Sequence, residues 1–180
     1  MKKYNIDVVI ETIKLINEHR RRPVTIKEIS MLIFLIDYNY IREIGISLFF
    51  DRFVKSDIGF IPLLTYDLLQ HINSGIPTLF KNKELVMKEH LSIKNGIIKR
   101  RLPPREDVLS SMARAVIEDI SLKFQEYSEE DLSQFHRDMK LYQYINTTFV
   151  KFRYIVPSEM REYVVSLEHN IDEFNEMFID

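Results

Sequence analysis

Cysteine is absent from the sequence, and glycine is scarce, with four among 180 residues. Without cysteine the chain has no disulfide, no thiolate nucleophile and no cysteine-ligated zinc site. Four glycines are too few for a glycine-rich phosphate loop, and the HExxH and GxSxG patterns of zinc proteases and serine hydrolases do not occur either. The familiar enzyme classes therefore lack their signature residues, and no cofactor is predicted, while a hydrolase or transferase with an unrecognised site stays open as an alternative.

Long apolar runs are also missing. The longest, residues 29–36, stops at Asp37, whereas a helix that spans a bilayer needs roughly 18 to 20 apolar residues. Two lysines near the N-terminus are followed by a segment that charged residues interrupt, so no secretion signal is expected. We therefore expect a cytoplasmic protein that does not enter a membrane.

The composition is that of a globular domain. Hydrophobic residues make up 46% and charged residues 29% of the chain, which excludes a disordered or collagen-like chain. A length of 180 residues falls in the roughly 100 to 200 residues that are typical of one domain. Residues 1–180 are therefore expected to form a single domain.

The net charge of −2 at pH 7 argues against a dedicated DNA-binding domain, because binding to phosphates usually requires an excess of basic residues. The charges are unevenly distributed. Residues 81–105 contain eight basic and two acidic side chains, and residues 159–180 contain seven acidic and one basic. We expect a polarised surface.

The spacing of apolar residues predicts the helices. Residues 5–20 have apolar side chains at every third or fourth position, which is typical of an amphipathic helix. Thr25 and Glu28 form a capping-box pattern at the start of residues 26–44, and Gly45 supplies a stop signal. Because part of this second helix is apolar on every face, we expect it to be buried at the centre. Further helices are predicted at residues 63–72, 106–124, 128–144 and 160–178.

Two segments are typical of short β-hairpins. Residues 47–62 are rich in β-forming residues, with polar pairs between them. Asn95-Gly96 separates residues 91–94 from residues 97–99, and this dipeptide favours a type I′ turn. The predicted fold class is therefore α+β and predominantly helical, with a buried central helix and one or two short β-hairpins.

Asp37 lies within the most apolar helix, between Ile36 and Tyr38. A buried carboxylate costs several kcal/mol unless it is paired and hydrogen-bonded. We predict Arg52 as its partner, because a guanidinium suits a carboxylate bidentately. The alternative, that Asp37 faces solvent on the one wet edge of the helix, remains open.

The sequence gives little support for a metal site or for acid–base catalysis. No two of the five histidines are three or four residues apart, as a metal pair on a helix would require, so no metal site is predicted. The acidic run Glu129-Glu130-Asp131 falls at a predicted helix start, where capping explains it.

Two basic clusters favour nucleic acid as a binding partner. Residues 20–22 are Arg-Arg-Arg and residues 99–101 are Lys-Arg-Arg, and a buried helix followed by a β-hairpin can belong to a winged-helix protein, with the Asn95-Gly96 hairpin as the wing. The alternative is a solvated helix end and a charged strand edge that discourages aggregation. A nucleic-acid-binding regulator therefore stays open as a second function.

The segment MLIFLIDYNYIREIG at residues 31–45, followed directly by ISLFFDRFVKSDIGFIP at residues 46–62, resembles the Panacea domain, or SocA-like antitoxin domain. The family's residue types are kept at six positions: Asp37, Gly45, Asp51, Arg52, Gly59 and Pro62. Phe53 stands where the family usually has tyrosine, and Phe60 replaces the first proline of the family's GPVP element. A looser similarity covers a later helix and the pattern Leu-x-x-x-His that ends at His136.

The resemblance covers about residues 26–144, so an acidic C-terminal helix at about residues 158–180 lies outside it. It implies a divergent member of a family of non-enzymatic antitoxins, many of them on prophages, which neutralise a toxin by direct binding or deliver it to a protease. A phage-borne inhibitor of a host protein is a further alternative.

Two mechanisms follow from the resemblance. In the first, exposed aromatic residues and their neighbours bind the partner: Phe49, Phe50, Asp51, Arg52, Phe53 and His136. In the second, the acidic C-terminal helix covers a basic surface of the toxin. Asp37, Gly45, Gly59 and Pro62 are expected to be structural. Aromatic residues in short strands are also typical of a core, so a buried position for these phenylalanines remains the alternative.

Overall fold

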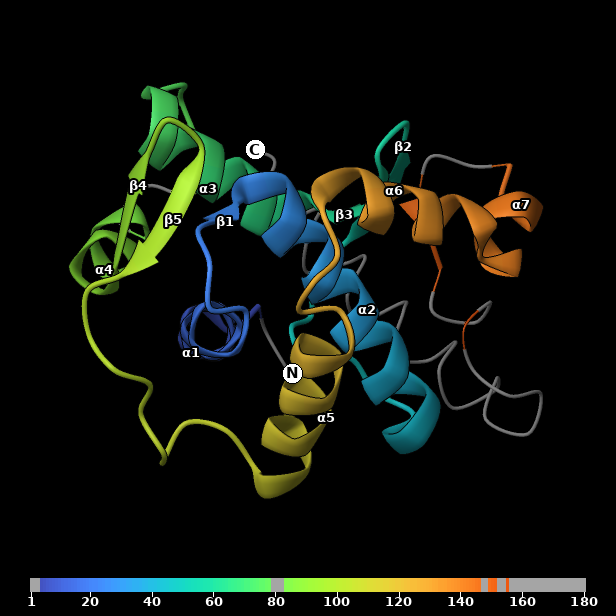
Figure 1. Ribbon diagram of the computed structural model, residues 1–180, viewed down its shortest axis with the longest axis horizontal. Helices are drawn as coiled ribbons and strands as arrows, with labels where there is room; N and C mark the ends of the chain where they lie inside the picture. Colours follow the sequence, from blue (N-terminus) through green and yellow to red (C-terminus); the bar gives the residue numbers. More distant parts are fainter. Residues whose placement is uncertain (1–3, 79–82, 147–148, 152–154, 156–180) are drawn as a thin grey trace.

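The computed structural model describes residues 4–78, 83–146, 149–151 and 155. They form a predominantly helical α+β fold with two three-stranded antiparallel sheets (Figure 1), which confirms the predicted fold class. The helices are α1 (Ile6–His19), α2 (Ile26–Ile44), α3 (Leu63–Ser74), α4 (Lys83–His90), α5 (Ser111–Lys123), α6 (Glu129–Asp138) and α7 (Lys140–Tyr144). The strands are β1 (Val24–Thr25), β2 (Phe53–Ser56), β3 (Gly59–Pro62), β4 (Leu91–Lys94), β5 (Ile97–Arg100) and β6 (Phe149–Val150).

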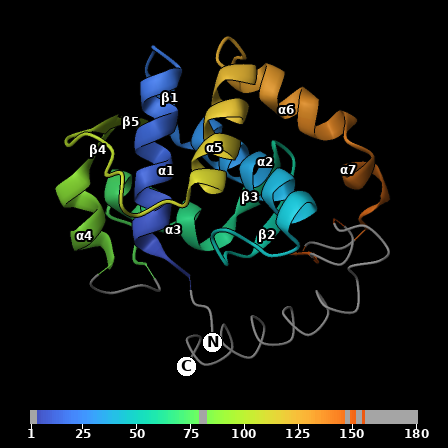
Figure 2. The ribbon, with the colours of Figure 1, turned by 90° about the horizontal axis from the view of Figure 1, so that it is seen from below.

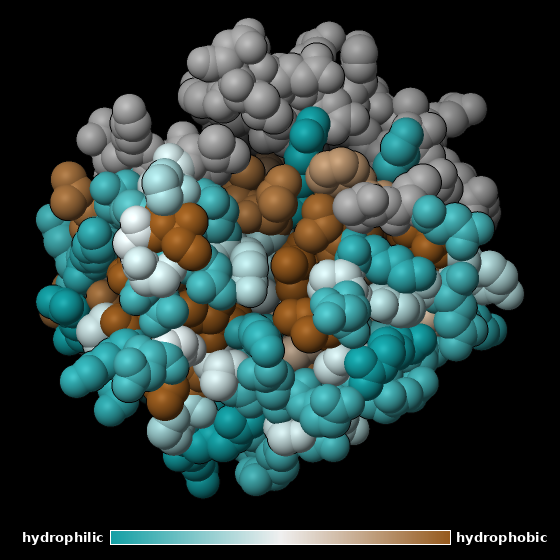
Figure 3. Space-filling model, turned by 90° about the horizontal axis from the view of Figure 1, so that it is seen from above, coloured by the Kyte–Doolittle hydropathy of each residue, from teal (hydrophilic) through white to brown (hydrophobic). Residues whose placement is uncertain are grey.

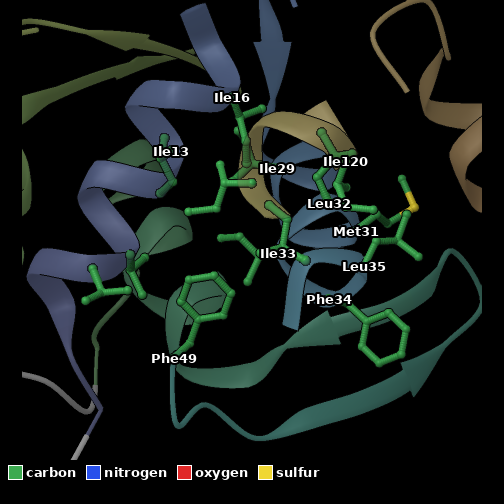
Figure 4. Packing of buried hydrophobic residues seen from close by; sticks show 14 of the residues in the cluster. Ile13, Ile16, Ile29, Met31, Leu32, Ile33, Phe34, Leu35, Phe49 and Ile120 are labelled. Atoms are coloured by element: carbon green, nitrogen blue, oxygen red, sulfur yellow. The ribbon is translucent and has the colours of Figure 1, made fainter. Parts of the chain in front are cut away.

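Helix α2 is the buried central helix that the sequence predicts, with the predicted bounds. Both hydrogen bonds of the capping box between Thr25 and Glu28 form, and Gly45 ends the helix with φ 83°. Helix α1 packs along α5 (Figure 2), and residues from both point toward α2. Figure 4 shows Ile16 of α1 and Ile120 of α5 on either side of Ile29. The core therefore surrounds α2.

The first sheet has the strand order β1-β5-β4. Its hairpin turns at Asn95 and Gly96, with φ 52° and 75°, so the predicted turn with two residues of positive φ is confirmed. The carbonyl of Gly96 accepts a hydrogen bond from Ile26 N at 2.9 Å, and its N–H donates to Asn73 Oδ1 at 2.7 Å. The turn is thus fixed to the start of α2 and the end of α3.

The second sheet has the order β3-β2-β6. The hairpin β2-β3 lies within residues 47–62, where we expected one, and it packs against α2.

Three helices differ from the prediction: α4 was not predicted, and two others differ in their bounds. Helix α5 begins at Ser111 rather than near residue 106, because Ser110 caps it and the preceding segment is tied to α1 through Arg105 N and Glu11 Oε2 at 2.6 Å. The helix predicted over residues 128–144 is interrupted at Met139, whose backbone is extended, with φ −62° and ψ 131°. The interruption turns α7 toward β2, where Tyr142 Oη donates to Ser56 O at 2.7 Å.

The helix predicted at residues 160–178 lies outside the described residues. Within the described part of the chain, no helix is both long and apolar enough to cross a bilayer.

Candidate functional site

Two of the phenylalanines that we expected to be exposed are buried. Phe49 is 0% and Phe53 1% exposed. The ring of Phe53 packs edge-on against Phe34 of α2, with 5.2 Å between centroids, and Phe49 lies in the core beside Ile33 (Figure 4). The expectation of an exposed aromatic plug is therefore wrong for these two residues, and the core alternative is confirmed. Phe50 is half-buried, with φ 54°.

Asp51 is also buried, and it caps α3. Its carboxylate accepts hydrogen bonds from Leu64 N and Thr65 N, each at 2.9 Å, and from Thr65 Oγ1 at 2.7 Å. The residue at the N-cap position itself, Pro62, makes no capping hydrogen bond with its side chain. Burial raises the pKa of Asp51 to about 6. Asp51 therefore stabilises a helix start and is not accessible to a partner.

Asp37 is 0% exposed, so the alternative of a wet helix edge is wrong. Its carboxylate accepts hydrogen bonds from Ser47 Oγ at 2.7 Å and Leu48 N at 2.6 Å. These donors are neutral, whereas the guanidinium of Arg52, our predicted partner, lies over the ring of Phe149 at 5.7 Å. Burial, with the charge of Asp51 as a further cause, raises the pKa of Asp37 to about 7. Asp37 holds the loop that follows α2.

His136 joins α6 to β3 in the interior. Its Nδ1 accepts a hydrogen bond from Phe60 N at 3.0 Å, and its ring lies 5.4 Å from the ring of Phe34. A Cβ on Gly59 would lie 2.8 Å from His136 Nδ1. Burial lowers the pKa of His136 to about 3. Because the side chain is 0% exposed, the prediction that it contacts a partner is wrong.

Most of the residues that carry the resemblance to the Panacea domain therefore have structural roles. Asp37 and Asp51 fix loops, Gly45 ends α2, and Gly59 lets His136 approach β3. A surface that recognises a partner has to use other residues. On the face shown in Figure 3, apolar side chains reach the surface as separate patches bordered by hydrophilic ones.

The clearest candidate is a groove of about 320 Å³ between α2, α5, α6 and α7. Its apolar and aromatic lining comes from four helices and the residues next to them: Leu35, Tyr38, Ile120, Phe124, Phe135, Met139 and Leu141. The polar lining consists of Asn39, Arg42, Lys123 and Lys140. We call this site the α2–α5–α6 groove.

The charged residues of the groove are all positive. Arg42, Lys123 and Lys140 are exposed, and no carboxylate is among the described lining residues. The guanidinium of Arg42 lies 5.5 Å from the ring of Tyr38, and Lys123 Nζ lies 5.5 Å from the ring of Phe124. An apolar floor with a cationic rim suits an anionic, partly apolar ligand.

Sequence reasoning missed this groove because its walls come from segments about 80 residues apart in the chain. Tyr38 and Arg42 lie one turn apart on α2, and Lys123 and Phe124 lie at the end of α5. The extended backbone of Met139 brings the start of α7 to the rim. The four-residue spacing of Tyr38 and Arg42 on α2 is visible as a local sequence pattern, but the way the separate segments come together is not.

Among the residues that the structure describes, no group of three or more metal-binding side chains is placed to hold an ion. Comparisons of the chain with protein-family models, with curated proteins and with solved structures find no match. The resemblance to the Panacea domain therefore stays a prediction from its residues.

Proposed function

We propose that this chain is a non-enzymatic, antitoxin-like protein of the cytoplasm that binds a partner protein through the α2–α5–α6 groove and thereby inactivates it. The observation that carries the proposal is the combination of aromatic floor and all-positive rim in one accessible groove. Aromatic and arginine side chains dominate the binding energy of protein interfaces. Tyr38, Phe135 and Arg42 supply these types.

The groove fits an acidic, amphipathic segment of the partner. Its volume of about 320 Å³ accommodates one or two apolar side chains, which is the size of an anchor rather than of a whole interface. Carboxylates on either side of that anchor would meet Arg42, Lys123 and Lys140. Rim charges of this kind mainly accelerate association, whereas the buried anchor slows dissociation.

The resemblance to the Panacea domain supports the same function. In that family, antitoxins are encoded beside the toxins that they neutralise. The positions of the resemblance have structural roles here, since Asp37, Asp51 and Gly59 fix loops and elements. A shared scaffold with a variable binding surface is compatible with partners that differ between members.

Co-expression tests this function. The product of the neighbouring gene is expressed in bacteria under tight control, with and without this protein, and growth and co-purification are measured. We expect toxicity of the neighbouring product alone, rescue by this protein, and a complex that survives purification. Neither rescue nor a complex, with this protein soluble and folded, would contradict the proposal.

A further inference from the structure

A second cluster of cations lies at the β1-β5-β4 sheet and shares no lining residue with the groove. Arg21 and Arg22, which follow α1, and Lys99 and Arg100 of β5 line a hollow of about 320 Å³ together with Asn17, Pro23 and Ile98. We call this site the basic hollow. Its two basic segments are about 80 residues apart in the chain and meet because β5 pairs with β1.

Carboxylates neutralise only part of this charge. Arg100 pairs with Glu18 at 2.6 Å and Arg22 with Glu28 at 2.5 Å. Arg21 and Lys99 are exposed and have no ion pair with any described residue. The chain as a whole carries a net charge of −2, so a local excess of cations is not a consequence of the overall composition.

Hydrogen bonds and the backbone conformation within the protein hold the basic residues in place before any ligand binds. The Arg20 guanidinium is buried and donates to Phe124 O at 2.8 Å and to Glu28 Oε1 at 3.1 Å, which anchors the turn after α1. The next residue, Arg21, has φ 54°, a left-handed conformation that directs the chain sharply into β1. The pairing of Val24 with Ile98 then brings the neighbouring Lys99 to the same hollow.

We propose that the basic hollow binds the phosphate backbone of a nucleic-acid duplex. Guanidinium groups bind phosphate oxygens bidentately, and a cluster of several cations favours binding to a backbone that carries many phosphates. The described residues that line the hollow include no aromatic side chain, so it offers no stacking platform for single-stranded bases. It also lacks the aromatic floor of the groove, which distinguishes it from a protein-binding site.

The expected binding is independent of base sequence. Helices α3 and α4 both lie between α2 and the β4-β5 hairpin along the chain, where a winged-helix protein has its reading helix. Helix α3 contains neither lysine nor arginine, and the lysines of α4, Lys83 and Lys88, do not line the basic hollow. Backbone contacts position a protein on nucleic acid but carry little sequence information. This second activity uses other residues than the groove and does not depend on the proposed function.

Fluorescence anisotropy with a labelled DNA duplex and an RNA hairpin of equal stem length tests the proposal between 25 and 200 mM salt. Two to four phosphate contacts predict a slope of log K against log salt of about −2 to −4. The ratio of the two affinities distinguishes DNA from RNA. Absence of binding to both at 25 mM salt, or equal binding to anionic lipid vesicles, would overturn the proposal.

Substitutions in the basic hollow test which residues contact the nucleic acid. The charge reversal Arg21→Glu/Lys99→Glu is expected to weaken binding at least tenfold. The neutral variant Arg21→Gln/Lys99→Gln should reduce the salt slope by about 2, and it keeps the test decisive if the reversal fails to fold. The control Lys88→Glu/Lys151→Glu, with the same change in net charge at exposed positions elsewhere, should retain the wild-type affinity. Equal losses in the hollow variants and the control would overturn the proposal.

Discussion

Three buried ionisable side chains carry much of the local structure at the scale of single residues. Asp37 and Asp51 accept hydrogen bonds from the loops and helix start that follow them, and His136 accepts one from β3. Each is 0% exposed, so each pays a desolvation cost that shifts its pKa toward the neutral form. The two carboxyl groups are shifted upward and the imidazole downward.

Replacement of Asp37 by asparagine should change how stability depends on pH. The pKa of Asp37 in the folded protein, about 7, lies above its ordinary value of 3.8. The folded state therefore takes up a proton at Asp37 as the pH falls from 8 to 5, the unfolded state does not, and the wild type gains stability over that window. Asp37→Asn lacks this gain, so its free energy of unfolding relative to wild type should fall by about 2 kcal/mol from pH 8 to pH 5. Urea denaturation of both proteins at pH 8 and pH 5 measures the two free energies of unfolding. A difference between variant and wild type that is the same at both pH values would contradict the prediction.

Substitution of Gly59 should be far more costly than substitution of Gly75. Both have positive φ, 129° and 72°, but an added Cβ meets His136 only at Gly59 and has open space at Gly75. We expect Gly59→Ala to destabilise the protein by about 3 kcal/mol and Gly75→Ala by about 1 kcal/mol, measured by chemical denaturation. The double variant Gly59→Ala/His136→Ala should cost less than the sum of its single variants. Additive costs would contradict the steric explanation.

At the scale of elements, α3 depends on a cap from outside the helix. The side chain of Asp51 accepts three hydrogen bonds from Leu64 and Thr65, and the residue at the N-cap position is a proline. Asp51→Ala should therefore cost about 2 to 3 kcal/mol and lower the protection of the Leu64 and Thr65 amides from hydrogen exchange. The matched control is Asp131, the exposed N3 residue of the capping box of α6, and Asp131→Ala should cost much less. Unchanged protection in α3 would show that the cap is dispensable.

Helices and turns whose determining residues lie close together in the sequence could be predicted. Helix α2 has its capping box and its terminal Gly45 in the sequence itself, so its bounds agree with the prediction. The hairpin turn at Asn95-Gly96 is equally local. The break at Met139 could not be predicted, because its causes lie far away in the chain. Lys55 Nζ donates to Ile145 O at 2.9 Å and so holds the end of α7 against β2.

The candidate site was harder to predict than the fold for the same reason. The resemblance singled out residues such as Asp51 and His136, but their buried positions follow from contacts across 13 and 76 residues. A local pattern of Phe-Phe-Asp-Arg does not distinguish a loop whose side chains are buried or half-buried, as residues 49–52 form here, from a segment that faces a partner. The groove, built from α2, α5, α6 and α7, has no continuous sequence signal.

At the scale of the whole molecule, two positive sites differ in their chemistry. The α2–α5–α6 groove combines cations with an aromatic floor, whereas the described residues that line the basic hollow combine cations with no aromatic side chain. The first suits an acidic protein segment and the second suits phosphates. A protein that is acidic overall, with a net charge of −2, thus presents positive charge at defined places.

The affinity for the captured partner protein tests the central claim most directly. Dissociation constants would be measured for the wild type, for the groove variant Arg42→Glu/Lys123→Glu and for the control Lys88→Glu/Lys151→Glu, all verified as folded. Reversal of two rim charges should weaken binding at least tenfold, mainly through slower association that depends on salt. The control should bind as the wild type does. Wild-type affinity in the groove variant would contradict the assignment of the groove as the partner-binding surface.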